Sequence, residues 1–335
     1  MQITVVGLGA IGALIAARLL DAGHSVAALA RGQTLAAVRE HGIELIRPGA
    51  GPGTSAERRS THRLPVSDDV QALPAAELVV VALKGPAFAA SAQALTPLWA
   101  DGAMVLPAMN GVPWWFMSTQ AGAAASPLVS VDPAGSIAAA LPLAQVLGCV
   151  VHLACSCPRP GQVLHAFGER LIVGEPHGAA QGPSARVERV AAALSAAGFK
   201  AEIGTDVRRD IWYKLWGNMT TNPISALTGA SADRIIDDEL VRAFMSRAMG
   251  EAAAIGERIG CPIAQSAEDR IGLTRQLGAF KTSMLQDAEA GRPLELDALV
   301  GAVREIGLRV GIATPNIDAL FGLTRLMGRQ RGLYG

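Results

Sequence analysis

The sequence is poor in cysteine, in aromatic residues and in excess charge of either sign. Four cysteines in 335 residues are too few for a disulfide framework, and Cys155-Ser156-Cys157 lacks the spacing of a common zinc site. We therefore expect buried or incidental thiols in a reducing cytoplasm, and no metal. The formal net charge of zero argues against a nucleic-acid partner and against a basic membrane-binding surface. The first residues show no secretory signal pattern, which also favours a cytoplasmic protein.

Half of the residues are apolar and only 4% are aromatic, so we expect an aliphatic core rich in alanine. A chain of 335 residues is long enough for two domains. Strand and helix patterns alternate up to Asp206, and beyond it nearly every segment has a helical pattern. We predict an α/β fold, with an NADP-binding Rossmann-type doubly wound sheet in residues 1–206. An all-α substrate domain is predicted to follow in residues 207–335.

The first 31 residues contain a dinucleotide-binding pattern. An apolar strand, Ile3–Val6, leads into Gly7-Leu8-Gly9-Ala10-Ile11-Gly12; a helix and a second apolar strand, Ser25–Ala30, follow. In this motif the first glycine makes a tight turn and the second lets the backbone approach a pyrophosphate. The third permits close packing of the helix, whose N-terminus faces the phosphates. A Gly-rich surface turn is the alternative, but the strand–helix–strand context favours the coenzyme motif.

Arg31 ends the second strand, at the position that distinguishes the two nicotinamide coenzymes. An acidic residue there would bind the ribose 2′-hydroxyl of NAD, whereas an arginine suits the 2′-phosphate of NADP. The sequence therefore predicts NADPH as the cofactor.

Further strands and helices alternate along the first domain. Helices are predicted over Gln33–His41, Phe88–Leu98 and Ser184–Ala197, and strands over Gly42–Ile46, Leu78–Leu83, Met104–Leu106, Gly148–Ala154, Gln162–His165, Arg170–Val173 and Lys200–Ile203. The Pro- and Gly-rich stretch Arg47–Arg63 is interpreted as a surface loop.

Lys84 and Asn110 each follow one of the apolar strands. Ligands of open parallel sheets bind beyond the carboxyl ends of the strands, so both residues are candidates for ligand contact. A solvated strand end for Lys84 and a plain turn for Asn110-Gly111 are the open alternatives.

The start of the helical half carries a row of polar residues. Lys214, Asn218 and Asn222 recur at i, i+4 and i+8, which places them along one helix face. Large apolar residues flank the row, namely Trp212, Leu215, Trp216 and Met219. We therefore expect the row to face a cleft with apolar walls, which would lower the pKa of the lysine as a general acid requires. The alternative is a solvated polar stripe. The Asn222-Pro223 step is expected to end or kink the helix.

A second polar cluster lies downstream, from Lys281 to Asp297, and contains Ser283 and Glu295. Alone, it is typical of a short helix, a Gly-Arg-Pro turn and an acidic residue at the start of the next helix, where the helix dipole favours it.

Together these segments resemble the ketopantoate reductase family over nearly the whole chain. The matching pieces are Gly7–Gly12, Leu83-Lys84, Asn110-Gly111, the Lys214/Asn218/Asn222-Pro223 row, and Ser283–Asp287 with Gly291-Arg292 and Glu295. The last two blocks are the specific ones, because other Rossmann reductases lack them in this order and spacing. The resemblance implies NADPH-dependent reduction of 2-dehydropantoate, or of a similar branched 2-oxo acid, to (R)-pantoate. This is a step towards pantothenate and coenzyme A.

The resemblance also implies a role for each matching residue. Lys214 would be the general acid that protonates the ketone oxygen. Asn218, Asn222 and Ser283 would bind the substrate, with Ser283 on the carboxylate. Cofactor contacts would come from the glycine loop, Arg31, Lys84, Asn110 and Glu295; Asn110 would also touch the substrate, and Glu295 would act beside Lys214. A homodimer is a candidate assembly.

Three features depart from the family pattern and leave the choice among 2-oxo acids open. The Arg47–Arg63 loop and the C-terminal tail make the chain longer than compact members. Ala232 stands where typical members carry another substrate-binding asparagine, and Trp114-Trp115-Phe116 brings bulky aromatics beside the expected nicotinamide region. Two other classes of protein stay open as well. One is another NADP enzyme of similar plan, such as a 3-hydroxyacid or polyol-phosphate dehydrogenase, which the Ser283–Glu295 block disfavours. The other is a non-catalytic dinucleotide sensor, which would need neither Lys214 nor Glu295.

Overall fold

The computed structural model describes residues 1–49, 57–119, 126–179 and 182–335. The chain divides into two compact units. Unit 1 comprises Met1–Met109 and Gly135–Val207, and unit 2 comprises Asn110–Ala134 and Arg208–Gly335. Unit 2 therefore includes a segment, Asn110–Ala134, that the sequence-based division after residue 206 places in the first domain.

Unit 1 contains the predicted Rossmann-type parallel sheet, with strand order β5-β2-β1-β6-β7. Its strands are β1 (Gln2–Val6), β2 (Ser25–Leu29), β5 (Val66–Ser67), β6 (Leu78–Val81) and β7 (Met104–Pro107). Every residue of β6 is buried, as expected for a central strand covered on both faces. The helical segments of the unit are α1 (Ala10–Asp21), α2 (Gly32–His41), η1 (Val70–Ala72), α3 (Gly85–Ser91), η2 (Ala92–Leu98), α4 (Ser136–Ala140), η4 (Leu143–Gln145) and α5 (Ala185–Ala196).

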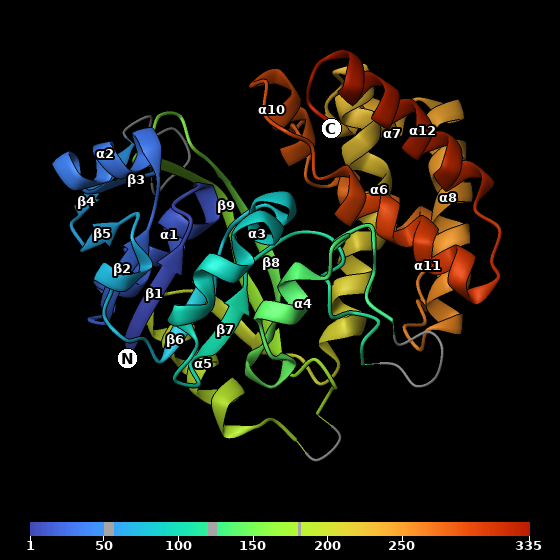
Figure 1. Ribbon diagram of the computed structural model, residues 1–335. Coiled ribbons are helices and arrows are strands. Elements are labelled where there is room, and N and C mark those ends of the chain that lie inside the picture. The colour runs from blue at the N-terminus through green and yellow to red at the C-terminus, as the bar shows by residue number, and fades with distance from the viewer. Residues whose placement is uncertain (50–56, 120–125, 180–181) are drawn as a thin grey trace. The chain divides into compact units, whose positions relative to one another are not determined.

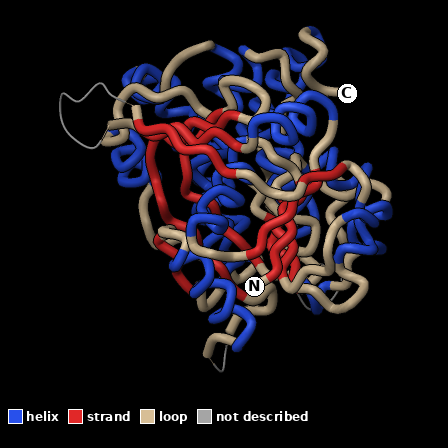
Figure 2. The backbone as a smooth tube through the Cα atoms, turned by 90° about the vertical axis from the view of Figure 1, so that its left-hand side faces the viewer, coloured by secondary structure: helices blue, strands red, loops and turns tan. Residues whose placement is uncertain are grey.

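A second, mixed sheet completes unit 1, and Figure 2 shows the strands in two separate groups. Its strands are β3 (Ile43–Arg47), β4 (Arg58–His62), β8 (Gly148–Ser156), β9 (Gln162–Gly174) and β10 (Lys200–Ile203). The long strand β9 pairs with β8, with β3 near its start and with β10 near its end. The unit thus has two sheets where the sequence led us to expect one.

Two predictions in this second sheet were wrong. Part of the expected loop Arg47–Arg63 is strand β4, which pairs antiparallel with β3, while its residues 50–56 lie outside the described part. The strand is polar and largely exposed, so it lacks the apolar signal of a buried strand. The segments predicted as two strands around Gly168 are one strand, β9. Gly168 has a φ of +81° where the pairing register with β8 shifts, so it marks a bulge rather than a turn.

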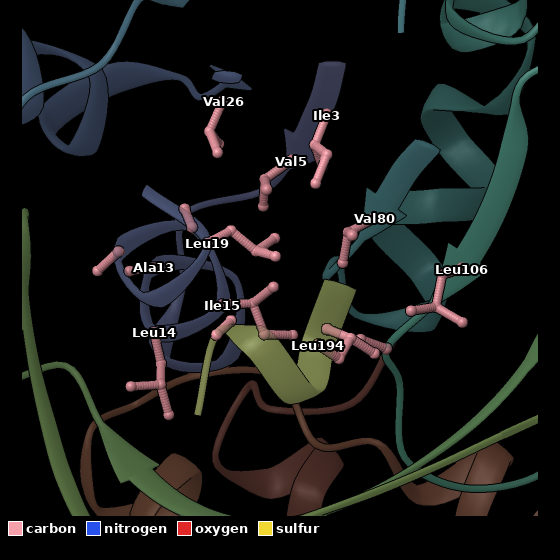
Figure 3. Packing of buried hydrophobic residues seen from close by; sticks show 14 of the residues in the cluster. Ile3, Val5, Ala13, Leu14, Ile15, Leu19, Val26, Val80, Leu106 and Leu194 are labelled. Atoms are coloured by element: carbon pink, nitrogen blue, oxygen red, sulfur yellow. The ribbon is translucent and has the colours of Figure 1, made fainter. Parts of the chain in front are cut away.

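The core of unit 1 forms around α1, which contacts strands of both sheets. All eight residues from Gly12 to Leu19 are buried, so the helix has little exposed surface. Figure 3 shows apolar side chains of β1, β2, β6, β7 and α5 gathered around those of α1; the labelled residues are Ile3, Val5, Ala13, Leu14, Ile15, Leu19, Val26, Val80, Leu106 and Leu194. This packing fixes the start of α1 against the end of β1.

Unit 2 is helical, as predicted, and the described residues within it form no strand. Figure 1 shows its helices in yellow to red. They are α6 (Val207–Thr228), α7 (Ala232–Asp237), α8 (Glu239–Arg258), α9 (Ala267–Arg275), α10 (Ser283–Glu289), the π-helical turn η5 (Asp297–Gly301), α11 (Ala302–Val310) and α12 (Pro315–Gln330).

The sequence predicts that α6 ends or kinks at the Asn222-Pro223 step, and the helix does not end there. It continues through Pro223 to Thr228. Proline lacks an N–H, so the carbonyl four residues earlier, on Met219, loses its helical partner while the helix goes on. The helix that the sequence predicts to start with an acidic residue after the Gly-Arg-Pro turn begins instead with the π-helical turn η5. Local π-helical geometry is common at functional sites.

Among the described residues, no helix is both long and apolar enough to cross a membrane.

Candidate active site

The loop between β1 and α1 has the geometry that the glycine motif predicts. Gly7 has a φ of +91°, and its N–H donates to the carbonyl oxygen of Leu29 at 2.9 Å. A Cβ at Gly12 would overlap the carbonyl oxygen of Gly7, so glycine is needed for α1 to start this close to the strand. A Cβ at Gly9, by contrast, would meet no atom within 4 Å. The backbone at Gly9 is therefore open to a ligand.

The N-terminus of α1 suits an anion. Gly9 caps the helix without a side-chain hydrogen bond, and the first turn contains no acidic residue. The N–H groups of the first turn have no acceptor within the helix. They and the positive end of the helix dipole can therefore bind a ligand or water. Leu8 is buried, so only its backbone can take part, and Ala10 and Ile11 form the half-buried first residues of α1. These residues fit the pyrophosphate of a dinucleotide.

Arg31 and Lys84 follow the two strands that neighbour β1. Arg31 comes after β2 and is the exposed N-cap residue of α2, while Lys84 comes after β6 and is the half-buried N-cap residue of α3. Because β2, β1 and β6 are adjacent and parallel, their carboxyl ends share one sheet edge with Gly7. Two cations thus accompany the glycine loop at that edge, which suits the phosphates of a dinucleotide.

Unit 2 brings together two of the residues that the sequence singled out. The Nζ atom of Lys214 donates a hydrogen bond to the Oδ1 atom of Asn110 at 2.6 Å, and both side chains are half-buried. An ammonium only donates, so the amide oxygen of Asn110 must face the lysine and its Nδ2 group must point elsewhere as a donor. A charge-assisted bond of this length orients the lysine.

The remaining two members of the row on α6 offer unpaired amides. Asn218 is half-buried and Asn222 is only 6% exposed. Neither side chain makes a hydrogen bond to any residue that the structure describes, and neither is fully enclosed. Because the amide groups of both side chains are not fully enclosed, they are available to a polar ligand on this face of α6.

The expected apolar walls of the row are not cleft walls. Trp212 and Trp216 are buried in the core of unit 2, where the Nε1 group of Trp216 donates to the carbonyl oxygen of Met249 at 2.7 Å. They lie on the side of α6 that packs inward, away from the lysine row. The sequence pattern correctly separated the polar side of α6 from its aromatic side. The aromatic side faces the core, however, and not a cleft.

The aromatic segment after Asn110 is also buried rather than placed to meet a ligand. Trp114, Trp115 and Phe116 are each less than 5% exposed. The ring of Phe116 stacks on Trp212 with centroids 5.9 Å apart, and Arg208 donates to the Phe116 carbonyl oxygen at 3.1 Å. These contacts hold the segment in unit 2, which explains why it does not belong to the first domain.

Ser283 and Glu295 occupy the two ends of the second polar cluster. Ser283 is the exposed first residue of α10, whose N-cap residue, Thr282, accepts a hydrogen bond from the Leu285 N–H at 3.2 Å. Glu295 is half-buried and lies two residues before η5. Among the described residues no hydrogen bond joins Ser283 to the lysine row. The structure thus brings Asn110 to Lys214, and leaves Ser283 as an exposed hydroxyl.

Position 232 does not offer a ligand contact. Ala232 is completely buried, and its N–H donates to the carbonyl oxygen of Phe280 at 3.0 Å.

Sequence reasoning missed Arg270, a cation beside the lysine row. Its guanidinium lies 5.2 Å from the centroid of the Tyr213 ring and would touch any Cβ added at Gly217, which lies between Lys214 and Asn218. Burial lowers the pKa of Arg270, and no described acid pairs with it. Its only sequence signal is the glycine in the middle of α6, which makes room for it.

Comparisons with known proteins agree on one family. Residues 3–178 match the family model described as "Ketopantoate reductase PanE/ApbA", and residues 206–328 match its "C terminal" counterpart. A 2-dehydropantoate 2-reductase from Mesorhizobium japonicum is 39% identical over 336 residues, which cover 100% of both chains. One from Halobacterium salinarum is 30% identical over 98% of this chain and 100% of its own. The crystal structure of a candidate ketopantoate reductase from Ralstonia solanacearum MolK2 is 50% identical, with a TM-score of 0.91 over 99% of each chain.

Proposed function

The chain belongs to the ketopantoate reductase family, and we propose on that basis that it reduces 2-dehydropantoate to (R)-pantoate with NADPH. The observation that carries this proposal is the bond between Lys214 and Asn110, because it orients a proton donor in a chain whose relatives are oxidoreductases. This reaction is a step on the route to pantothenate and coenzyme A.

The chemistry follows from the groups on α6. When bound, the coenzyme supplies a hydride to the carbonyl carbon of the 2-oxo acid. Lys214 stabilises the negative charge that grows on the carbonyl oxygen and donates a proton to it. Asn110 holds the ammonium through Oδ1 and presents its Nδ2 group as a further donor.

The substrate is held by polar groups of unit 2. The unpaired amides of Asn218 and Asn222 suit the oxygen atoms of a hydroxylated 2-oxo acid, and the exposed hydroxyl of Ser283 suits its carboxylate. We assign Glu295 to the nicotinamide-ribose side and to the environment of Lys214. With Ala232 buried, Asn218 and Asn222 carry this recognition without a third asparagine.

The coenzyme is assigned to unit 1, and its phosphorylated form is favoured by charge. The glycine loop takes the pyrophosphate at the N-terminus of α1, and Lys84 adds a cation at the same sheet edge. Arg31 is exposed at the end of β2, where it can pair with a 2′-phosphate. We therefore propose NADPH rather than NADH as the physiological coenzyme.

The proposal is tested by following the oxidation of NADPH and NADH spectroscopically with a panel of 2-oxo acids. The panel should include 2-dehydropantoate, its analogue without the hydroxyl, and an unbranched 2-oxo acid of similar length. We expect the highest kcat/KM for 2-dehydropantoate with NADPH. A clear preference for an unbranched acid would instead indicate a different 2-oxo acid reductase, and no oxidation with any acid would indicate a sensor.

We further propose that the enzyme works as a homodimer in the cytoplasm. Exposed leucines occur on consecutive helices of unit 2, Leu308 on α11 and Leu323 and Leu326 on α12, which is the kind of apolar surface that a partner covers. The four cysteines are thiols rather than disulfides in the structure, and one of them, Cys157, is exposed, which fits a reducing compartment. Light scattering of wild type and of Leu323→Asp tests the assembly, with a monomeric variant expected from a dimeric wild type.

A further inference from the structure

The C-terminal residues fold back onto the segment that carries Glu295 and η5. The hydroxyl of Tyr334 donates to Oδ1 of Asp297, in the first position of η5, at 2.7 Å. The N–H of Leu294 donates to the carbonyl oxygen of Leu333 at 2.9 Å. The tail is thereby bonded on both sides of Glu295.

The tail is itself held at the end of α12. Leu333 is buried, and its N–H donates to the carbonyl oxygen of Gly328 at 2.7 Å. A Cβ at Gly328 would lie 2.8 Å from the Cβ atom of Tyr334, so a glycine is needed for this close packing. The last residues are thus an integral part of unit 2.

The turn η5 in turn supports the segment that starts at Asn110. The N–H of Val112 donates to the carbonyl oxygen of Ala298, in the second position of η5, at 2.9 Å. Gly111 has a φ of +83°, and a Cβ there would lie 2.5 Å from the same oxygen. The backbone beside Asn110 is therefore seated directly on η5.

These contacts form one continuous chain from the C-terminus to the proton donor. It runs from Tyr334 to Asp297, through the backbone of Ala298 to that of Gly111 and Val112, and through Asn110 to Lys214. We propose that Tyr334 is a positioning residue for the reaction. Its bond to Asp297 fixes η5, and η5 fixes the amide oxygen that orients the lysine.

The kinetic part of this inference rests on the proposed reductase function, whereas the hydrogen bond between Tyr334 and Asp297 does not. Positioning has a signature that simple stabilisation lacks. Small misplacement of a catalytic group lowers the rate of the chemical step, while binding of the coenzyme by unit 1 is unaffected. Loss of stability alone would lower the melting temperature and leave the turnover of folded enzyme unchanged.

The experiment compares the two tyrosines of the chain. Tyr334→Phe removes the hydroxyl that bonds Asp297; Tyr213→Phe removes an equivalent hydroxyl that donates to Gln265 at 2.6 Å in the same unit. Single-turnover hydride transfer, the KM for NADPH and hydrogen exchange of the Val112 amide are measured for both. For Tyr334→Phe we expect hydride transfer to fall about tenfold, an unchanged KM for NADPH, and faster exchange at Val112. Tyr213→Phe should match wild type.

A second pair of variants tests Asp297, the acceptor of the Tyr334 hydrogen bond. Asp297→Asn keeps an oxygen that accepts from Tyr334 and should retain most of the activity, whereas Asp297→Ala should behave as Tyr334→Phe does. The double variant Asp297→Ala/Tyr334→Phe should be no slower than either alone, because both break one contact.

Unchanged hydride transfer in Tyr334→Phe would overturn the inference, and so would unchanged exchange at Val112. The wild-type enzyme could be inactive towards all 2-oxo acids while Tyr334→Phe still speeds exchange of the Val112 amide. That result would overturn the proposed function but not the structural link between Tyr334 and the Asn110 segment.

Discussion

Lys214 donates a 2.6 Å hydrogen bond to Asn110, a residue that lies 104 positions earlier in the chain. Asn110 follows the last strand of the parallel sheet in sequence, yet it belongs to the same compact unit as the lysine. The proposed proton donor and its hydrogen-bond partner are therefore assembled within one unit. The glycine loop, Gly7–Gly12, to which we assign the coenzyme, belongs to the other.

Asn110→Ala should lower turnover by about ten- to a hundredfold. It removes a hydrogen bond to a charged group, which typically contributes about 1.5–3 kcal/mol. Steady-state and single-turnover rates with NADPH and 2-dehydropantoate measure the effect. The matched control is Asn316→Ala, at the start of α12, whose side chain donates to Glu251 of α8. Equal rates in Asn110→Ala and wild type would show that the lysine needs no such partner.

Arg31→Ala should raise the KM for NADPH strongly and the KM for NADH little. The guanidinium is exposed beyond β2, and a charge-assisted bond to the 2′-phosphate would contribute roughly 1.5–3 kcal/mol. Arg39→Ala serves as a control, because Arg39 is exposed on the same helix, α2, and pairs with Asp68. Equal use of the two coenzymes by the wild-type enzyme would remove the basis for this prediction.

Glu305 should make the stability of unit 2 depend on acidic pH. Its carboxylate accepts the N–H groups of Val129 and Ser130 at 3.0 and 2.8 Å. Burial alone would raise the pKa of Glu305, but these hydrogen bonds and Arg309 outweigh it and lower the pKa below its ordinary value. The stabilisation is therefore present above the pKa of the unfolded chain and is lost as pH falls through the lower, folded value.

Melting temperatures of wild type and Glu305→Gln, measured from neutral pH down to pH 3, test this dependence. We expect wild type to be the more stable at neutral pH and the difference to shrink at acidic pH. Glu289→Gln is the control, since the ion pair that this exposed residue makes among the described residues is with Lys281. A difference that stays constant with pH would contradict the assigned role of the carboxylate.

The two cysteines of the Cys155-Ser156-Cys157 segment should differ sharply in reactivity. Burial raises the pKa of Cys155 to about 12, with a smaller contribution from Cys157, so its thiol stays protonated at neutral pH. Cys157 is exposed. Brief alkylation with iodoacetamide at pH 7.5 should label Cys157 and spare Cys155, as peptide mass spectrometry would show. Comparable labelling of both would mean that β8 opens readily at its end.

The sequence predicted the elements whose signals are local. The glycine loop, the parallel strands around it and the polar row on α6 follow from short patterns of glycine spacing, apolar runs and helical periodicity. It failed where tertiary contacts decide the outcome. Gly168 and Glu169 have the composition of a turn, yet pairing with β8 keeps them inside β9.

Predictions for the candidate site failed for the same reason, because tertiary contacts decide where the side chains lie. Helical spacing aligned Lys214 with Asn218 and Asn222, but it could not tell that Trp212 and Trp216 face the core. Asn110 belongs to the helical unit because its segment makes contacts with residues far along the chain, such as Ala298 and Glu305. Arg270 has no motif at all, because a half-buried cation with no acidic partner among the described residues follows from packing alone.

The most direct test of this account is the rate of hydride transfer in Lys214→Ala, measured by stopped flow in a single turnover. If Lys214 is the general acid, its removal should slow the step by about a hundredfold to ten-thousandfold, the usual range for such a group. NADPH affinity should hardly change, and Lys214→Arg should not restore the rate, because a guanidinium keeps its proton at any relevant pH. Lys200→Ala, which removes an exposed lysine paired with Glu202, should leave the rate intact. An unchanged rate in Lys214→Ala would contradict the mechanism.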